Sequence, residues 1–209
     1  EAMHFGGSSQ LATTSVVSFS DHTYEAWIRT SDLTHQAQII GTHDPSTNGG
    51  SFLFLTTGGM LRAQVQTGAG QYKTWDATSA MVADGQWHHV AYSFNATGQT
   101  AAIYVDGVAQ GTTPGGAGTL GTLAVTNKEL DIGSAQDLSL GFTGDIADVR
   151  IWTDVRTGTE VSGAMNHEMI GDEPGLLHNW GVEAGAVVRT TSAAIGVGLS
   201  GITMVTDGS

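Results

Sequence analysis

Two neighbouring segments carry the residue types that recognise sugars. Tyr72 and Trp75 lie close together in one segment, and Arg62, Gln64 and Gln66 alternate along the segment before it. Aromatic rings pack on the C–H faces of a sugar, while planar amide and guanidinium groups bond its hydroxyls. If the polar face is concave, these side chains form a binding groove. The alternative is a solvated outer face, with Trp75 covering the edge of a sheet.

The patterns that would indicate catalysis are incomplete. The run Glu129-Leu130-Asp131-Ile132-Gly133-Ser134 approaches the Glu-x-Asp-x-x-Glu strand of jelly-roll glucanases, but Ser134 stands where the second glutamate would be. Hydrolysis of a glycosidic bond by two carboxylates requires that pair. We therefore expect no catalytic activity. A polysaccharide hydrolase or lyase is the remote alternative, and Glu25 and Asp148 are then the carboxylate pair to examine.

Composition and charge exclude several classes of partner. The 209 residues carry seven Lys and Arg against 20 Asp and Glu, a net charge of −13. Binding to nucleic-acid phosphates needs clustered cations, so a nucleic-acid partner is not expected. No apolar run approaches the roughly 20 residues of a membrane helix, so membrane insertion is not expected. The chain has no cysteine, which excludes disulfides and thiol chemistry.

Short alternating segments predict strands along most of the chain. Tyr24, Ala26 and Ile28 alternate with Glu25, Trp27 and Arg29, so Trp27 either lines the groove or packs on the other face. The main predicted strands are His22–Thr30, Ser51–Thr57, Leu61–Thr67, Trp87–Phe94, Ala101–Val105, Asp145–Trp152 and Leu176–Trp180.

The remaining segments predict turns, one loop and one helix. Asp106-Gly107 predicts a tight hairpin turn. Gly111–Gly121 is rich in glycine and predicts a loop. Thr159–Met169 predicts the one helix, because Val161, Met165 and Met169 recur every four residues. Roughly a dozen strands with frequent turns predict an all-β fold, a two-sheet antiparallel β-sandwich.

Several motifs, in order along the chain, resemble those of a known superfamily. They are Tyr24–Ile28, Asp84–Ala91 with Ile103–Gly107, Gly144–Trp152 and Glu173–Trp180. The run Asp-Gly-Gln-Trp-His-His-Val-Ala and the strand Gly-Asp-Ile-Ala-Asp-Val-Arg-Ile-Trp are the most specific. Together they resemble laminin-G-like and pentraxin-like members of the concanavalin A-like lectin/glucanase superfamily. The resemblance covers about Phe5 to Trp180 and implies a jelly roll.

The resemblance also implies a calcium site. Pentraxin-like members hold calcium between a loop after an early strand and a Gln-Asp segment near the Gly-Asp-Ile strand. Asp44, Gln136 and Asp137 stand at the corresponding places, and Asn48 is the candidate substitute for the Asn position that Pro45 occupies. Calcium takes six to eight oxygen ligands, which acidic loops supply. The alternative is that Asp44 and Asp137 are ordinary turn residues.

These observations predict a non-catalytic binding module. We expect a single jelly-roll domain over residues 1–209, excised from a longer protein that is secreted or displayed at a cell surface. Its ligand is expected to be a glycan, bound by Arg62, Gln64, Tyr72, Trp75 and Asn48, with calcium at Asp44, Gln136 and Asp137. The alternative is an adhesive spacer that binds a protein partner and separates other domains of the parent chain.

Overall fold

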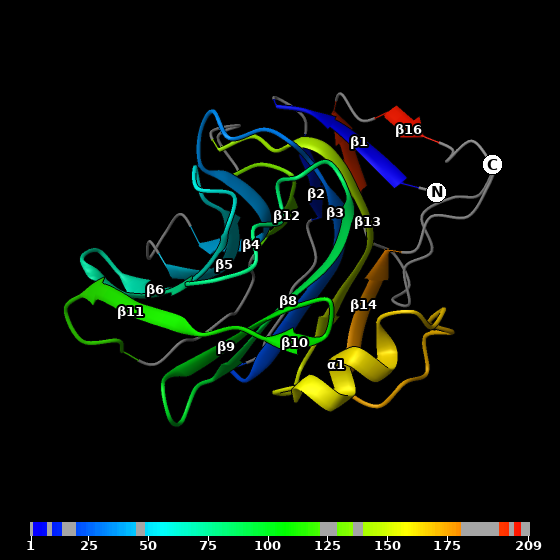
Figure 1. Ribbon diagram of the computed structural model, residues 1–209. Coiled ribbons are helices and arrows are strands. Elements are labelled where there is room, and N and C mark those ends of the chain that lie inside the picture. The colour runs from blue at the N-terminus through cyan, green and yellow to red at the C-terminus, as the bar shows by residue number, and fades with distance from the viewer. Residues whose placement is uncertain are drawn as a thin grey trace.

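Two antiparallel sheets stack face to face in the computed structural model, which describes residues 2–7, 10–13, 20–44, 49–121, 129–135, 140–180, 197–200 and 203–205 (Figure 1). Sheet A has the order β10 (Val108–Ala109), β9 (Thr100–Val105), β8 (Trp87–Asn95), β3 (His22–Arg29), β13 (Thr143–Trp152), β1 (Ala2–Gly6) and β16 (Thr203–Val205), and β14 (Leu176–Trp180) also pairs with β13. Sheet B has the order β11 (Thr112–Ala117), β7 (Gln71–Ala77), β6 (Leu61–Gly68), β5 (Gly49–Leu55), β4 (Ala37–Asp44), β12 (Glu129–Ile132), β2 (Gln10–Thr13) and β15 (Val197–Ser200). The predicted all-β sandwich is confirmed.

The apolar side chains of each strand point between the sheets because successive strand residues face opposite sides. In β3, Tyr24, Ala26 and Ile28 are fully buried in the shared core, as the alternation predicts. Every residue of β5 is buried, as expected for a strand covered on both faces. Burial of each large apolar side chain contributes about 1.5–3 kcal/mol of stability. The burial of these alternating side chains is therefore the main interaction that holds the two sheets together.

A small polar network crosses this core. His22 Nε2 lies 2.6 Å from Ser51 Oγ, and Ser51 Oγ lies 3.1 Å from the Tyr92 hydroxyl. The Tyr24 hydroxyl lies 3.1 Å from Thr42 Oγ1. Burial lowers the pKa of His22 to about 4, so the ring is neutral at pH 7 and can be both donor and acceptor. The network fixes sheet A against β4 and β5 without a buried charge.

The glycine-rich segment forms a strand rather than the predicted loop. Thr112–Ala117 pairs with β7 in register, from Thr112 opposite Ala77 to Ala117 opposite Tyr72. It is the outermost strand of sheet B, where one side of the backbone needs no partner. Pro and Gly are tolerated on such edges. On the outer side of an edge strand the N–H that proline lacks has no partner strand to bond. The loop prediction was therefore wrong.

Helix α1 (Gly158–Ala164) is shorter than predicted and lies on the outer face of sheet A. Thr157 and Glu160 form a capping box at its N-terminus. Val161 is its buried residue and packs against Ala91 and Tyr104. The helix ends at Ala164 rather than Met169, because sheet side chains take the carbonyls that would continue it, as described below.

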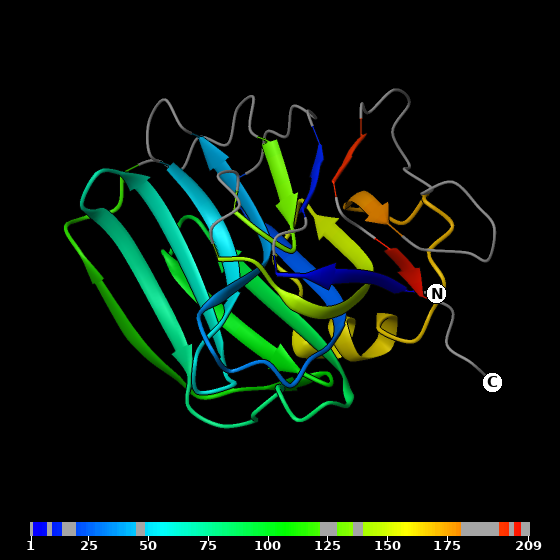
Figure 2. The same cartoon turned by 90° about the horizontal axis from the view of Figure 1, so that it is seen from above.

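The first and last described strands, β1 and β16, lie side by side in sheet A (Figure 2). β1 pairs with β16 in sheet A, and β2 pairs with β15 in sheet B. Residues near the two ends of the sequence therefore extend both sheets. In the part of the chain that the structure describes, no helix has the length and apolar character needed to cross a membrane.

Candidate functional site

The polar face is the outward side of β6 and β7 in sheet B, made by Arg62, Gln64, Gln66, Tyr72 and Asp76. Cross-strand pairing places Arg62 opposite Asp76 and Gln66 opposite Tyr72. The intervening residues of β6 are fully buried on the core side. The prediction that Arg62, Gln64 and Gln66 share one polar face is confirmed, and Tyr72 joins them.

Arg62 is held by a two-pronged ion pair at one end of this face. Its Nε and Nη2 donate to the two carboxylate oxygens of Asp76, and Nη1 donates to Gln36 Oε1 at 3.2 Å. Hydrogen bonding to Asp76 raises the pKa of Arg62 further above its ordinary value. The side chain remains about one-third exposed, so the guanidinium is a fixed, flat, charged group at the surface.

The middle of the polar face presents amides beside a phenol ring. Gln64 Nε2 donates to Gln66 Oε1 at 3.3 Å, and both side chains are half-buried, as is Tyr72. On the neighbouring strand β5, Phe52 pairs with Gln64 and Phe54 pairs with Arg62. The two phenylalanine rings stack with their centroids 5.5 Å apart. Each amide retains donors and acceptors beyond this one bond, so the strip can bond the hydroxyls of a ligand.

Trp75 does not belong to the polar face. It pairs with Ala63, points to the core side of β7, and is 7% exposed against Phe94 at a centroid distance of 5.9 Å. Alternation along β7 puts Trp75 on the face opposite Tyr72, so the predicted groove of Trp75 with Arg62 and Gln64 was wrong. The strand's own alternation was the signal that separates the two rings.

Trp27 is likewise a packing residue, on the other sheet. Its Nε1 donates to the carbonyl oxygen of Met165 at 3.0 Å, and its ring meets His89 edge-on at 5.4 Å. Trp27 therefore supports the segment after α1 rather than a groove in sheet B.

The predicted calcium ligands lie mostly outside the described residues. Asn48, Gln136 and Asp137 are not described, and of Asp44 only the backbone is described, paired with Gly49 at the end of β4. The strand that precedes residues 136–139 runs antiparallel to β4, with Ile132 opposite Ile40. Four strand residues separate Ile40 from Asp44, about 13 Å.

Among the described residues, no three His, Asp or Glu side chains are grouped so as to hold a metal ion. Calcium binding stays a prediction.

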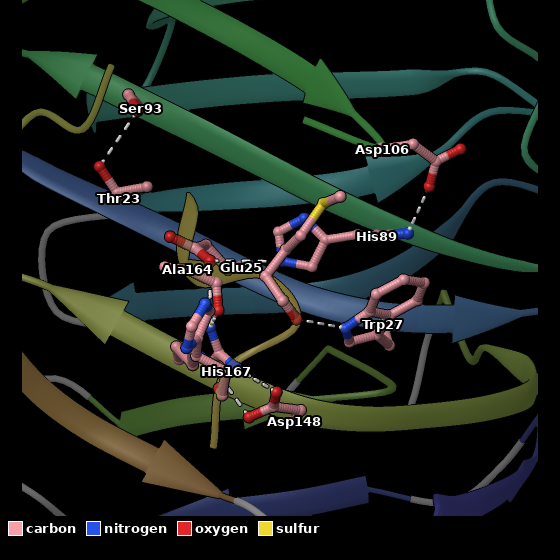
Figure 3. A network of polar contacts seen from close by, with 11 residues as sticks. Thr23, Glu25, Trp27, His89, Ser93, Asp106, Asp148, Ala164 and His167 are labelled. Atoms are coloured by element: carbon pink, nitrogen blue, oxygen red, sulfur yellow. Dashed lines mark hydrogen bonds and ion pairs between the residues drawn. The ribbon is translucent and has the colours of Figure 1, made fainter. Parts of the chain in front are cut away.

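A buried charged network lies beneath α1 (Figure 3). Glu25 and Arg150 are fully buried and His89 is 1% exposed. Arg150 Nη1 lies 3.8 Å and His89 Nε2 3.3 Å from Glu25 Oε2, while Asp148 forms a close ion pair with Arg150. Arg150 also donates to the carbonyls of Ala164 and His167, each at 2.8 Å. These bonds end the helix and fasten it to sheet A.

Glu25 and Asp148, the carboxylate pair that a hydrolase would use, both belong to this network. Arg150 stands between Glu25 and Asp148, and Glu25 has no exposed surface. Two hydrolytic carboxylates must flank an accessible bond, and this pair does not. Sequence patterns placed Glu25 on the outward face of β3, but nothing in them showed that Arg150 and His89 lie beside it.

The motif Asp84–Ala91 is explained by contacts around a single histidine. His88 Nδ1 lies 2.9 Å from Asp106 Oδ2 and Nε2 lies 3.1 Å from Asp84 Oδ1. Asp106 also accepts from the backbone N–H of His89 and occupies the hairpin turn at φ +50°. The motif therefore ties the start of β8 to the β9–β10 turn, which is a structural role.

His88 should give the fold a measurable pH dependence. Burial lowers its pKa, but hydrogen bonds with Asp106 and Asp84 together outweigh burial and raise it above the ordinary 6.5. A folded-state pKa above the unfolded one stabilises the fold fully below pH 6.5, and this contribution is lost as the pH rises through the folded pKa. Denaturant unfolding of wild type and His88→Gln should show the largest difference in unfolding free energy near pH 6. A difference that grows with pH would contradict this assignment.

The chain belongs to the concanavalin A-like lectin/glucanases superfamily. The sequence model of that superfamily matches residues 5–162. The predicted resemblance is therefore confirmed. No curated protein sequence matches the chain significantly.

Solved structures show the same fold at low sequence identity. A Bacteroides ovatus protein described as a candidate carbohydrate-binding protein is 21% identical, with a TM-score of 0.70 over 97% of this chain; the chain spans 58% of that protein. A heptameric pentraxin from Limulus polyphemus is 17% identical, with a TM-score of 0.66, 96% of this chain and 95% of that one covered. The CBM40 of a Ruminococcus gnavus sialidase, bound to α2,3-sialyllactose, is 13% identical, with a TM-score of 0.57, 78% of this chain and 95% of that one covered.

Proposed function

We propose that this domain is a non-catalytic carbohydrate-binding module that holds its ligand on the polar face of sheet B. The observation that carries the proposal is the half-exposed row of Gln64, Gln66 and Tyr72, two adjacent amides beside a phenol ring. Amides bond sugar hydroxyls, and the ring offers a flat surface to sugar C–H groups. Two of the structural neighbours carry carbohydrate binding in their names, which supports the same ligand class.

Arg62 sets one end of the proposed site. Its ion pair with Asp76 fixes the guanidinium before a ligand arrives, which reduces the entropy lost on binding. The carboxylate of Asp76 balances its charge, so this end suits neutral hydroxyls better than an anion. The proposed ligand of the polar face is therefore a neutral glycan.

Glycan-array screening followed by calorimetry tests the proposal. Tyr72→Ala and Gln64→Ala should each weaken binding of the selected glycan about tenfold, since each removes about 1–1.5 kcal/mol of contacts. Gln86→Ala, which removes an exposed amide elsewhere on the surface, is the matched control and should bind like wild type. Variants that keep both fold and affinity would contradict the polar face as the site.

Two other outcomes would replace the proposal. A folded domain that binds no glycan on a broad array favours the protein-binding spacer. Turnover of a polysaccharide by the purified chain would contradict a non-catalytic role. The proposed setting is extracellular, in a secreted or cell-surface protein with further domains.

Calcium dependence is a separate part of the proposal, with its own test. Calcium bound through Asp44, Asn48, Gln136 and Asp137 would raise the thermal midpoint, because a ligand that binds only the folded state stabilises it. The midpoint should rise in calcium, return to its starting value with chelator, and respond less to magnesium. Asp137→Asn should reduce the rise. A midpoint indifferent to calcium would contradict this part and leave the glycan proposal standing.

A further inference from the structure

Lys73 differs from the arginines that the structure describes. The four described arginines each have a carboxylate oxygen within 4 Å: Arg29 with Asp145, Arg62 with Asp76, Arg150 with Asp148 and Arg156 with Asp154. Within the described part of the chain, Lys73 has no such partner. In a protein with a net charge of −13, an ammonium without a neighbouring carboxylate is a distinctive feature.

Lys73 lines a hollow at the edge of the sandwich. A hollow of about 360 Å³ is lined by Lys73, Trp75, Gln99 and the edge strand β11. A second hollow of about 360 Å³ shares Gln99 and is lined also by Phe94 and Leu120. We call the two together the side crevice. It lies between β7 of sheet B and the β8–β9 turn of sheet A, on the opposite face of β7 from Tyr72.

Gln99 is the residue that joins the two hollows. Its backbone has φ +49°, a left-handed conformation that glycine or asparagine ordinarily occupies. Its Nε2 donates to the Leu120 carbonyl at 3.2 Å, and its Oε1 has no partner among the described residues. Strained non-glycine residues persist where surrounding structure holds them and often mark functional sites. Gln99 lines both hollows, with one hydrogen bond to the Leu120 carbonyl.

The contents of the side crevice define a chemical class of ligand. Lys73 supplies a compact positive charge, which suits a carboxylate. Gln99 Oε1 can accept a hydrogen bond from a hydroxyl. Trp75, Phe94 and Leu120 form the apolar floor of the crevice, and at most 7% of each residue is exposed. The charge of −13 disfavours polyanions, so the ligand that fits carries a single negative charge.

We propose that the side crevice is a second binding site, which takes a saccharide residue bearing one carboxylate, with Lys73 on the carboxylate and Gln99 on a hydroxyl. The site rests on the proposed function in that it extends carbohydrate binding from the polar face to a separate subsite. A glycan with an acidic terminal residue meets both requirements.

Nuclear magnetic resonance titration of the full chain tests this proposal, with methyl glucuronide as the probe and methyl glucoside as its uncharged analogue. The glucuronide should shift the indole N–H signal of Trp75 and bind at least about tenfold more tightly than the glucoside, the effect of one charge-assisted hydrogen bond. Lys73→Gln should abolish this preference and Lys73→Arg should restore most of it. Gln86→Ala, which removes an exposed amide outside both proposed sites, should leave it unchanged.

A second variant separates binding from folding. Gln99→Gly relieves the left-handed backbone, so the variant should be as stable as wild type or more so, yet it should bind the glucuronide several-fold more weakly. Equal affinity of wild type and Lys73→Gln for the glucuronide would overturn the subsite. If the subsite fails while neutral glycans still bind the polar face, the proposed function stands. If no saccharide binds anywhere, both proposals fall.

Discussion

Arg150→Met should lower the free energy of unfolding by about 3–5 kcal/mol, the range for removing one partner of a buried ion pair. Arg150 is fully buried and faces Glu25, which is also fully buried. Without the guanidinium, the Glu25 carboxylate keeps only the His89 ring beside it, and the carbonyls of Ala164 and His167 lose the Arg150 donor. Methionine fills similar space, so lost packing is a minor part of the effect. Denaturant unfolding monitored by circular dichroism measures the change.

The matched control for this variant is Arg62→Met on the polar face. Arg62 also pairs with an aspartate and also donates to a third group, but both partners are about one-third exposed. Exposed ion pairs contribute about 0–1 kcal/mol, so this variant should remain close to wild type in stability. Equal losses in the two variants would contradict the special role of burial. Amide exchange should also become faster in α1 of Arg150→Met and not in Arg62→Met.

Alternation within single strands predicted much of the fold. The outward row Arg62, Gln64, Gln66 and the buried row on the other side of β6 follow from the two-residue period alone. The hairpin at Asp106-Gly107 was predictable because Asp and Gly favour the left-handed backbone that both positions adopt. Local rules of this kind hold because they depend on neighbours in sequence.

The wrong predictions concern segments whose secondary structure is decided by contacts with other segments of the chain. β11 is a strand because it pairs with the free edge of β7. The composition of the glycine-rich segment does not indicate this pairing. α1 ends at Ala164 because Arg150 and Trp27, both far away in sequence, take the carbonyls of residues 164, 165 and 167. The periodic Val161, Met165 and Met169 cannot reveal this competition.

The candidate sites show the same division. The polar face was predictable, because its members alternate on two consecutive strands. The side crevice was not, because Lys73 and Gln99 meet only when the two sheets stack. Trp75, predicted for the first site, lines the second one. Residue types thus indicated which side chains could bind a ligand, whereas the stacking of the two sheets decides which of them lie together.

Gly133→Ala should cost about 3 kcal/mol or more of folding stability, for two reasons that a matched glycine can separate. Gly133 has φ +79°, and a Cβ there would lie 2.2 Å from two ring carbons of Phe5, which is fully buried. The left-handed backbone costs about 1–2 kcal/mol with a side chain, and overpacking a core adds about 1–3 kcal/mol.

Gly85 has nearly the same backbone, φ +82°, with no atom within 4 Å of its Cβ position. Gly85→Ala should therefore cost only the backbone part, about 1–2 kcal/mol. Denaturant unfolding of both variants measures the difference, which reports how closely β1 of sheet A packs on the end of β12 in sheet B. Equal losses would show that Phe5 can move aside, and that the two sheets are less tightly joined at this end than the burial of Phe5 indicates.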